Sequence, residues 1–272
     1  MSRDPLTLLL WAWVAMAGWM ALMWLVERIQ RNASLADVGW CVGLVLVVVG
    51  YAWSATGVIE RKFLLAAMAS VYGLRLGGYI FFYRVIGRIE DQRYQRLRRL
   101  WRLDEPLRMF GYFQLQATAV VLFSLPFLAV IQNPRPSFSL WELAGVIVWM
   151  IGIAGESLAD WQLAGFRAKP WNHDRVCREG LWFFSRHPNY FFEWVHWWAY
   201  VVMAVDSPSW LLTWIGPLVM GVSLTRITGI PWAEEQALRS RGEDYRRYQD
   251  TTNAFIPWWP KTGHSSPAPF KN

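Results

Sequence analysis

A ten-residue run, Ser185–Trp194, gathers side chains that can bind anions and accept hydrogen bonds: Ser-Arg-His-Pro-Asn-Tyr-Phe-Phe-Glu-Trp. Its proline suits the first turn of a helix, where the missing N–H is not needed. Arg186, His187 and the amides of that helix start would together attract an anion. Asn189 and Glu193 are four residues apart, so both lie on one face of the predicted helix. The alternative, a basic interfacial anchor with aromatic neighbours, does not explain this second pair.

Ionisable side chains also occur inside apolar segments, where each is costly unless it is paired or faces water. Asp37 begins one such segment, and Tyr72 and Arg75 lie three apart in the next. Asp37 could instead cap a helix. Arg75 could form a buried structural ion pair with Asp37 or Glu156. With both alternatives open, these side chains are candidates for binding the polar group of a substrate.

Two carboxylates, Glu156 and Asp160, are four residues apart near the end of another apolar segment. They could accept hydrogen bonds from ribose or amide groups, or they could balance the charges of Arg167 and Lys169. A solvated helix end is the simpler alternative.

The composition places these residues in a membrane protein. The chain has 272 residues, of which 54% are hydrophobic and 17% charged, with 20 tryptophans and a mean hydropathy of +0.18. A soluble domain is less apolar and carries more charge. These values exclude a disordered chain, a disulfide-rich secreted domain and an ordinary cytosolic enzyme. The fold class expected is all-α, a polytopic membrane helix bundle.

Seven membrane-spanning helices are predicted from apolar runs of the required length. A further helix within Pro231–Pro260, with Glu234, Glu235 and Tyr245, is expected to lie at the membrane surface. Residues 1–262 are expected to form one domain, with the cofactor half at about 140–260 and a disordered tail at 263–272. The seven predicted spans are Leu6–Val26, Val38–Ile59, Phe63–Tyr83, Met109–Ile131, Leu140–Leu163, Tyr190–Val205 and Trp210–Thr225.

Basic residues predict the orientation, since lysine and arginine favour the cytoplasmic side. With a cytoplasmic C-terminus, 22 of the 27 basic residues fall on that side, and Arg75 lies within a span. The arginine-rich run Arg84–Arg108 is interpreted as lipid-facing, with no site assigned. The net charge of +7 is attributed to contact with anionic lipid rather than with nucleic acid.

Other common sites are not indicated. Cys41 and Cys177 are far apart, and His173 and His264 are isolated, so no metal site is predicted. His196 is expected to be a hydrogen-bonded polar residue inside the bundle. The chain has no nucleophile elbow, Walker loop or GxGxxG motif.

The Ser185–Trp194 run resembles the bacterial branch of the steroid 5-alpha-reductase family. The resemblance includes Gly229-Ile230-Pro231-Trp232-Ala233-Glu234 and Ala254-Phe255-Ile256-Pro257-Trp258, and it is strongest over residues 150–260. It extends to Asp37-Val38-Gly39-Trp40, Gly73-Leu74-Arg75-Leu76 and Glu90-Asp91-Gln92-Arg93-Tyr94. It implies a seven-helix membrane fold, location in a bacterial inner membrane, and NADPH-dependent reduction of the carbon–carbon double bond of 3-oxo-4-ene steroids.

The resemblance also implies residue roles. Asp37 and Tyr72 correspond to the acid–tyrosine pair that holds the substrate carbonyl, with aspartate in place of the animal glutamate. Phe192 replaces a glycine before the glutamate, which is expected to narrow the cofactor groove. Glu156 stands where the animal enzymes have asparagine, and the spacing beyond Arg226 differs by several residues. The positions that correspond to NADPH-binding residues are Glu156, Asp160, Arg167, Arg175, Asn189, Glu193, Trp197 and Arg226.

Related patterns leave other functions open. The Arg-His-Pro-x-Tyr pattern with a later Glu-Glu pair is similar to that of isoprenylcysteine carboxyl methyltransferases, which use S-adenosylmethionine, and it also occurs in sterol C14- and C7-reductases. Asn189 with Glu193, and Asp37 with Tyr72 and Arg75, favour the reductase. A non-catalytic transporter or scaffold is the third class, although no inverted repeat is visible.

The expected reaction adds hydride at the β carbon of an enone and a proton at the α carbon. Negative charge then builds on the carbonyl oxygen, and a hydrogen-bond donor there lowers the barrier. Tyr72 is the expected donor. Asp37, protonated by burial, is the expected second donor and the partner of Tyr72.

Overall fold

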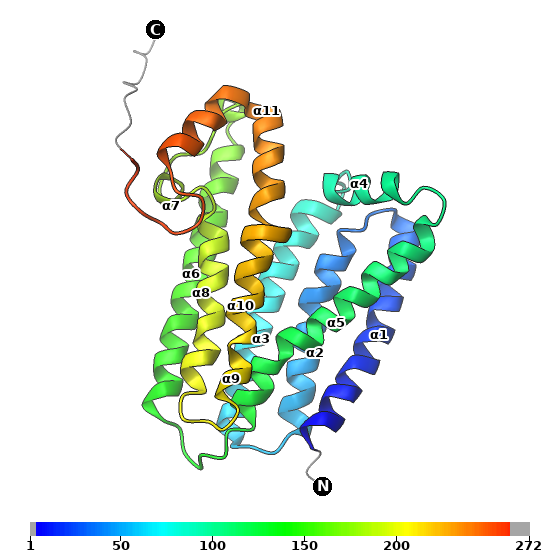
Figure 1. Cartoon of the computed structure of the whole chain (residues 1–272), viewed down its shortest axis with the longest axis vertical. Helices are drawn as coiled ribbons and strands as arrows, with labels where there is room; N and C mark the ends of the chain where they lie inside the picture. Colours follow the sequence, from blue (N-terminus) through cyan, green and yellow to red (C-terminus); the bar gives the residue numbers. More distant parts are fainter. Residues whose placement is uncertain (1–3, 262–272) are drawn as a thin grey trace. The chain divides into compact units, whose positions relative to one another are not determined.

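The computed structural model describes residues 4–261, and the predicted tail 263–272 lies outside them. These described residues form helices and no β-strand (Figure 1). The longer helices are α1 (Pro5–Gln30), α2 (Leu35–Ser54), α3 (Ile59–Ile80), α5 (Glu105–Ile131), α6 (Leu140–Arg167), α8 (Pro188–Met203) and α11 (Ile230–Thr251). The shorter ones are η1 (Phe81–Val85), α4 (Gln92–Leu100), η2 (Pro170–Asn172), α7 (Leu181–Phe184), α9 (Trp210–Thr213), α10 (Ile215–Val222) and η3 (Ser223–Ile227).

Six stretches among residues 4–261 are long and apolar enough to cross a membrane. They are α1, α2, α3 with η1, α5, α6, and the stretch Trp210–Thr251. The all-helical membrane fold is therefore confirmed, with six candidate spans in place of the seven predicted. The predicted span Tyr190–Val205 coincides largely with α8, which has 16 residues and is not among the six.

The predicted span Val38–Ile59 extends too far. Helix α2 ends at Ser54, and Ile59 already belongs to α3. Gly57 has a φ of +149°, and a Cβ atom there would come within 2.1 Å of the carbonyl oxygen of Ile131. Only glycine allows the backbone so close to the end of α5, which is why the chain turns here.

The chain divides into two compact units. The first unit runs to Gly145 and includes Tyr200–Gly216, and the second comprises Val146–Ala199 and the chain from Pro217 onward. The division falls within α6, within α8 and within α10.

In the first unit, α2 packs against α1, α3 and α5. Apolar attraction between helices is weak in lipid, so small residues that let backbones approach become important. Gly39 and Gly43 of α2 face methionines of α1, whereas Gly73 and Gly77 of α3 lie against Cys41 of α2. A Cβ atom on Gly73 would come within 2.8 Å of the carbonyl oxygen of Cys41. The α2–α3 contact is therefore a close backbone contact.

In the second unit, α6 packs against α8 through two glycines. A Cβ atom on Gly152 would lie 2.5 Å from the Cβ atom of His196, and one on Gly155 would lie 2.3 Å from the ring of Phe192. Because the residue numbers rise on one helix as they fall on the other, α6 and α8 are antiparallel. Trp194 joins α8 to α10, since its Nε1 donates to the Pro217 carbonyl at 3.0 Å.

Helix α11 is bent, as Figure 1 shows, and its backbone is non-helical at Gly242. Gly242 has φ 50° and ψ −122°, a combination that residues with a Cβ atom rarely adopt. The bend brings the two parts of α11 together: Glu234 and Gln249 are 15 residues apart, yet their side chains are in contact at 2.8 Å. In a straight helix these residues would be separated by roughly 22 Å.

The close α2–α3 contact predicts different effects for two glycines of α3. Gly73→Ala should destabilise the protein by about 1–3 kcal/mol, because Val45 and the Cys41 carbonyl must move. Gly78→Ala should leave stability unchanged or higher, since a Cβ atom at Gly78 would have no neighbour within 4 Å. Thermal unfolding in detergent, followed by circular dichroism, measures both. Equal melting temperatures for the two variants would contradict the close contact.

Candidate functional site

A polar group of four residues lies where α6 faces α8. Glu156 and Asp160 of α6 and Glu193 of α8 are buried, and Asn189 of α8 is partly buried. Asn189 Nδ2 donates to Asp160 Oδ1 at 3.1 Å. The antiparallel register places Glu156 level with Glu193, one helical turn from this hydrogen bond. The structure thus brings these four predicted site residues into one region of the second unit.

Two neighbours on α8 hold Glu193 from the following turn. Trp197 Nε1 donates to Glu193 Oε1 at 3.2 Å, and the Trp197 ring is fully buried. His196 is also fully buried, and its Nδ1 lies 2.8 Å from the Glu193 carbonyl oxygen. Because a carbonyl only accepts hydrogen bonds, Nδ1 carries the proton. His196 is therefore a hydrogen-bonded residue inside the bundle, as predicted.

Of the two polar atoms of the Asn189 side-chain amide, the nitrogen has a hydrogen-bond partner among the described residues and the oxygen does not. The amide atom that faces Asp160 is assigned as the nitrogen, Nδ2, because an ionised carboxylate can only accept a hydrogen bond. Asn189 Oδ1 is buried and has no hydrogen-bond partner among residues 4–261. A buried acceptor without a donor typically costs about 1–3 kcal/mol. This oxygen is therefore available to an N–H or O–H group of a ligand.

The Phe192 ring packs directly on Gly155 of α6. The resemblance implied that Phe192, in place of a glycine, narrows the cofactor groove. The ring fills the space that a larger residue at position 155 would need, so it tightens the α6–α8 contact beside the polar group.

The three predicted cofactor arginines are exposed. Arg167 is in the last turn of α6, and Arg226 is in η3. Arg175 lies in the loop after α6, where its carbonyl accepts a hydrogen bond from Arg241 Nε at 2.9 Å. Within residues 4–261, no hydrogen bond or ion pair joins the side chains of Arg175 or Arg226 to the buried polar group.

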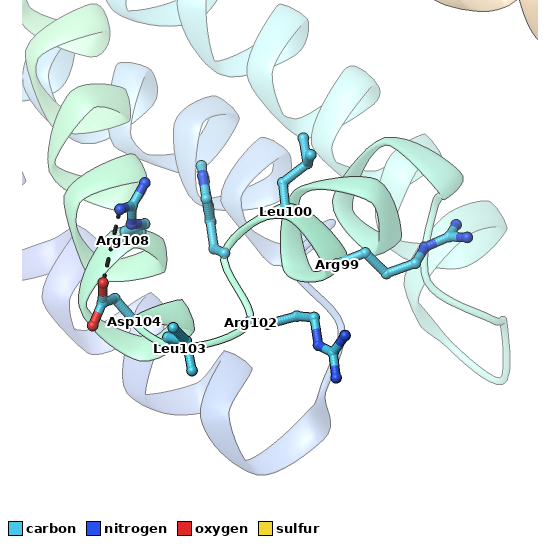
Figure 2. A pocket seen from close by; sticks show the side chains of 7 residues that line it. Arg99, Leu100, Arg102, Leu103, Asp104 and Arg108 are labelled. Atoms are coloured by element: carbon cyan, nitrogen blue, oxygen red, sulfur yellow. Dashed lines mark ion pairs between the residues drawn. The ribbon is translucent and has the colours of Figure 1, made fainter.

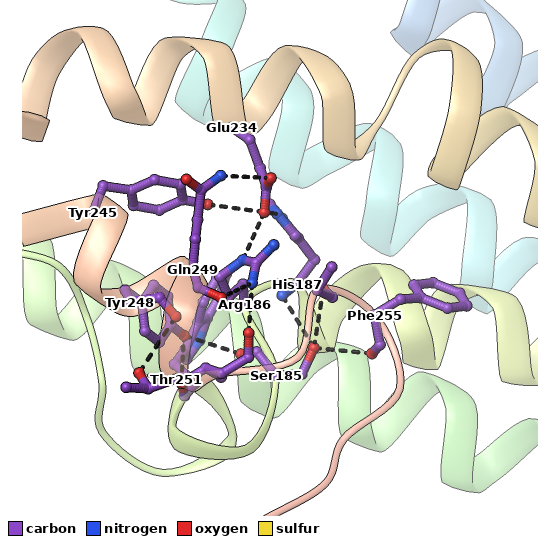
Figure 3. A network of polar contacts seen from close by, with 12 residues as sticks. Ser185, Arg186, His187, Glu234, Tyr245, Tyr248, Gln249, Thr251 and Phe255 are labelled. Atoms are coloured by element: carbon purple, nitrogen blue, oxygen red, sulfur yellow. Dashed lines mark hydrogen bonds and ion pairs between the residues drawn. The ribbon is translucent and has the colours of Figure 1, made fainter. Parts of the chain in front are cut away.

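Arg186 and His187 were expected to form an anion site, and the structure shows that a carboxylate of this chain occupies it. Glu234 Oε1 accepts from Arg186 Nε at 2.6 Å and lies 3.3 Å from His187 Nε2 (Figure 3). Glu234 Oε2 accepts from Gln249 Nε2 at 2.8 Å. The bend at Gly242 brings Gln249 to this carboxylate, so the contact could not be read from linear spacing.

The chain after α11 completes this network. Arg186 Nη1 donates to the carbonyls of Gln249 and Thr252, and its backbone N–H donates to Asn253. Ser185 Oγ donates to the Phe255 carbonyl at 2.9 Å. The conspicuous Ser-Arg-His stretch therefore fastens the start of α8 to α11 and the segment after it.

In the first unit, Asp37 is held by two side chains that the sequence analysis did not assign to a site. Tyr94 OH donates to Asp37 Oδ1 at 2.8 Å, and Arg93 Nη2 forms an ion pair with Asp37 Oδ2 at 3.2 Å. Tyr94 and Arg93 are thus additional partners of Asp37, and its predicted pairing with Tyr72 stays a prediction. Tyr94 OH further lies 3.5 Å from the Tyr112 hydroxyl.

Tyr72 and Arg75 lie on α3, where Gly73 contacts α2. Tyr72 is fully buried, and its ring packs edge-on against Trp40 of α2 at 6.4 Å between centroids. Arg75 is partly buried. Tyr72, Arg75 and Asp37 thus share the first unit, while the predicted cofactor residues belong to the second.

The segment Glu90–Tyr94 fixes α4 over Asp37. Asp91 accepts from the Arg93 N–H at the start of α4; burial opposes ionisation of Asp91, but Arg93 outweighs burial and lowers the pKa of Asp91. Arg98 of α4 forms ion pairs with Glu27, Glu90 and Glu105. The prediction that the whole run Arg84–Arg108 faces lipid is therefore wrong for Arg93 and Arg98. The Glu-Asp-Gln-Arg-Tyr motif, Glu90–Tyr94, is the sequence feature that could have indicated these inward contacts.

Glu234→Ala should destabilise the protein by roughly 3–5 kcal/mol, because it leaves the Arg186 guanidinium buried without a counter-charge. The Arg186 side chain is only 10% exposed. The matched control is Glu243→Ala on the same helix, which removes an exposed pair with Arg246 and should change stability by less than about 0.5 kcal/mol. Thermal unfolding of both variants measures the difference. A Glu234→Ala protein as stable as the control would contradict the role assigned to Glu234.

His187 should make stability depend on pH. Burial lowers the pKa of His187 below its ordinary value of 6.5, although Glu234 opposes this shift. The unfolded chain therefore binds a proton that the folded protein does not, and stability should fall as the pH drops below 6.5. The melting temperature between about pH 7.5 and about pH 5.5 should fall less in His187→Gln than in wild type. His173→Gln, at an exposed position, should behave like wild type, and an unchanged slope in His187→Gln would contradict the assignment.

Comparisons with known proteins bear on the whole chain. Neither the curated proteins nor the solved structures include a match to it. Residues 23–252 match the family described as "Protein of unknown function (DUF1295)". This stretch covers most of the chain, including the α6–α8 polar group, the Glu234 network and Asp37. The chain therefore belongs to the DUF1295 family.

Proposed function

We propose that this protein reduces the carbon–carbon double bond of an apolar enone within the membrane, with NADPH as hydride donor. A 3-oxo-4-ene steroid represents the substrate class. The observation that best supports the proposal is the buried Asn189 Oδ1, which lacks a donor among the described residues. A nicotinamide carboxamide or a ribose hydroxyl offers the N–H or O–H group that this oxygen needs.

The residues around Asn189 fit the rest of such a cofactor. Glu156, Asp160 and Glu193 are buried acceptors for ribose or amide groups. Arg167 ends α6 and Arg175 lies in the loop that follows, and with Arg226 they would bind the diphosphate and 2′-phosphate. Arg186 is not assigned to phosphate, because Glu234 already accepts from it.

Side chains of α2 and α3 would act on the carbonyl. When bound, NADPH supplies hydride to the β carbon of the enone. Tyr72 would donate a hydrogen bond to the carbonyl oxygen and so stabilise the charge that builds there. Asp37 would act through its contacts with Arg93 and Tyr94, which position polar groups at the start of α2. Arg75 would bind substrate or have a structural role.

The proposed topology has seven crossings. Helix α8, at 16 residues, is about 24 Å long, somewhat shorter than a typical hydrocarbon core of about 30 Å. We assign it as the seventh crossing, with α11 at the membrane surface. The arginine and lysine bias supports a cytoplasmic C-terminus and cofactor site, and the proposed location is a bacterial inner membrane.

Cofactor titration tests the proposal. Tryptophan emission of detergent-purified protein should be quenched by energy transfer to bound NADPH, since Trp194 and Trp197 lie on α8. Saturable NADPH binding is expected, with affinity about tenfold lower in Asn189→Ala, which corresponds to one lost hydrogen bond. Ser157→Ala is the matched control, because its hydroxyl donates to the Ile153 carbonyl of its own helix.

A second variant separates binding from chemistry. Tyr72→Phe should bind NADPH as wild type does while reducing a 3-oxo-4-ene steroid with a lower kcat. An absence of NADPH binding, together with a melting temperature raised by S-adenosylmethionine, would overturn the reductase in favour of a methyltransferase. Wild-type turnover in Tyr72→Phe would overturn the assigned donor.

A further inference from the structure

The segment Ile86–Asp104 connects two candidate spans, α3 with η1 and α5. A segment between two consecutive spans lies at a boundary between membrane and water. Its side chains nevertheless include large apolar groups without cover. Leu100 is 69% exposed and Leu103 is 96% exposed, and Leu107 at the start of α5 is also exposed. Such groups are stabilised at a lipid boundary and not in bulk water.

A depression of about 430 Å³ lies at the turn between α4 and α5 (Figure 2). Its residues interleave three arginines with leucines and one carboxylate, so the local charge is positive. They are Arg99, Leu100, Trp101, Arg102, Leu103, Asp104 and Arg108.

The three guanidinium groups are largely available to an external acceptor. Arg102 is exposed and forms no hydrogen bond or ion pair with any of residues 4–261. Arg99 Nε makes a 3.3 Å contact with the Gln95 carbonyl of its own helix. Arg108 lies 3.7 Å from Asp104, and both side chains are more than half exposed, so this pair contributes little.

We propose that the α4–α5 turn, Arg99–Arg108, binds the phosphate headgroup of an anionic phospholipid. Guanidinium groups bind phosphate oxygens through paired N–H donors, and basic residues beside a membrane are attracted to anionic lipid. The leucines select a lipid over a free phosphate, because their apolar side chains would enter the acyl-chain boundary. This inference is independent of the proposed reductase activity.

Helix α4 connects this site to Asp37. Tyr94 and Arg98 are four residues apart on one face of α4 and point inward, to Asp37 and to three glutamates. Arg99 and Leu100 are on the exposed face at the end of the same helix. A lipid held at the turn would therefore restrain the helix that carries the partners of Asp37.

Thermal unfolding in neutral detergent with added phosphatidylglycerol or phosphatidylcholine tests the proposal. Wild-type protein should melt at a higher temperature with phosphatidylglycerol than with phosphatidylcholine. The triple variant R99Q/R102Q/R108Q should lose most of this difference while keeping its melting temperature in phosphatidylcholine, because all three side chains are exposed. Its affinity for phosphatidylglycerol, measured by native mass spectrometry, should be roughly 100-fold lower.

The matched control is R239Q/R246Q/R247Q on α11, which removes the same charge from exposed positions. It should retain most of the phosphatidylglycerol effect, and an equal loss in both triple variants would overturn a specific site in favour of diffuse attraction. L100S/L103S should also lose the effect if the ligand is a lipid. Inorganic phosphate serves as the soluble probe, and an equal rise in melting temperature with it would overturn the lipid assignment.

Discussion

Close contact between helix backbones at glycine determines where polar side chains can meet in both units. In lipid, helices gain little from apolar contact with one another, so the approach itself has to be provided by small residues. Gly73 and Gly77 provide it between α3 and α2, and Gly152 and Gly155 provide it between α6 and α8. The Asp160–Asn189 hydrogen bond requires this approach, because short side chains span a narrow gap between helices only when the backbones are near.

Two arginines inside the protein, Arg61 and Arg186, are each paired with a carboxylate. Arg61 and Glu142 of the first unit are completely buried and form a two-contact ion pair, with Asn133 contributing a carbonyl to the guanidinium. Arg186 and Glu234 of the second unit form a mostly buried ion pair through one contact. Such pairs contribute modestly to stability as a whole, but the loss of one partner is costly. They consequently fix which segments must be neighbours.

Much of the helical architecture was accessible from the sequence. Apolar length identified the helices that can cross a membrane, and spacing of four residues predicted that Glu156 would share a face with Asp160 and Asn189 with Glu193. These features depend on neighbours along one helix, where geometry is regular. The end of α2 was misplaced because Gly57 turns the chain against Ile131, a residue far along the sequence.

Contacts between residues that are distant in the sequence could not be predicted from it. Arginines that face lipid and arginines that face inward look alike in a charge run, so Arg93 and Arg98 were not distinguished from their neighbours. Glu234 reaches Arg186 across 48 residues, and Gln249 joins them through the bend at Gly242. A glycine within a polar helical stretch indicates in the sequence that the helix can bend at this point. The sequence does not indicate the direction of the bend.

The contacts of Arg186 with residues much later in the chain affect when this side chain acquires its partners during synthesis. The carbonyl of Thr252, which accepts from Arg186, is 66 residues further along the chain. At about 5–20 residues per second, the ribosome needs roughly 3–13 s to add it. For that interval Arg186, just before α8, lacks part of its set of hydrogen-bond acceptors, and until Glu234 is added it also lacks its counter-ion. A chain interrupted before Glu234 would keep Arg186 without its counter-ion permanently, so quality-control proteases could distinguish such incomplete copies from complete ones.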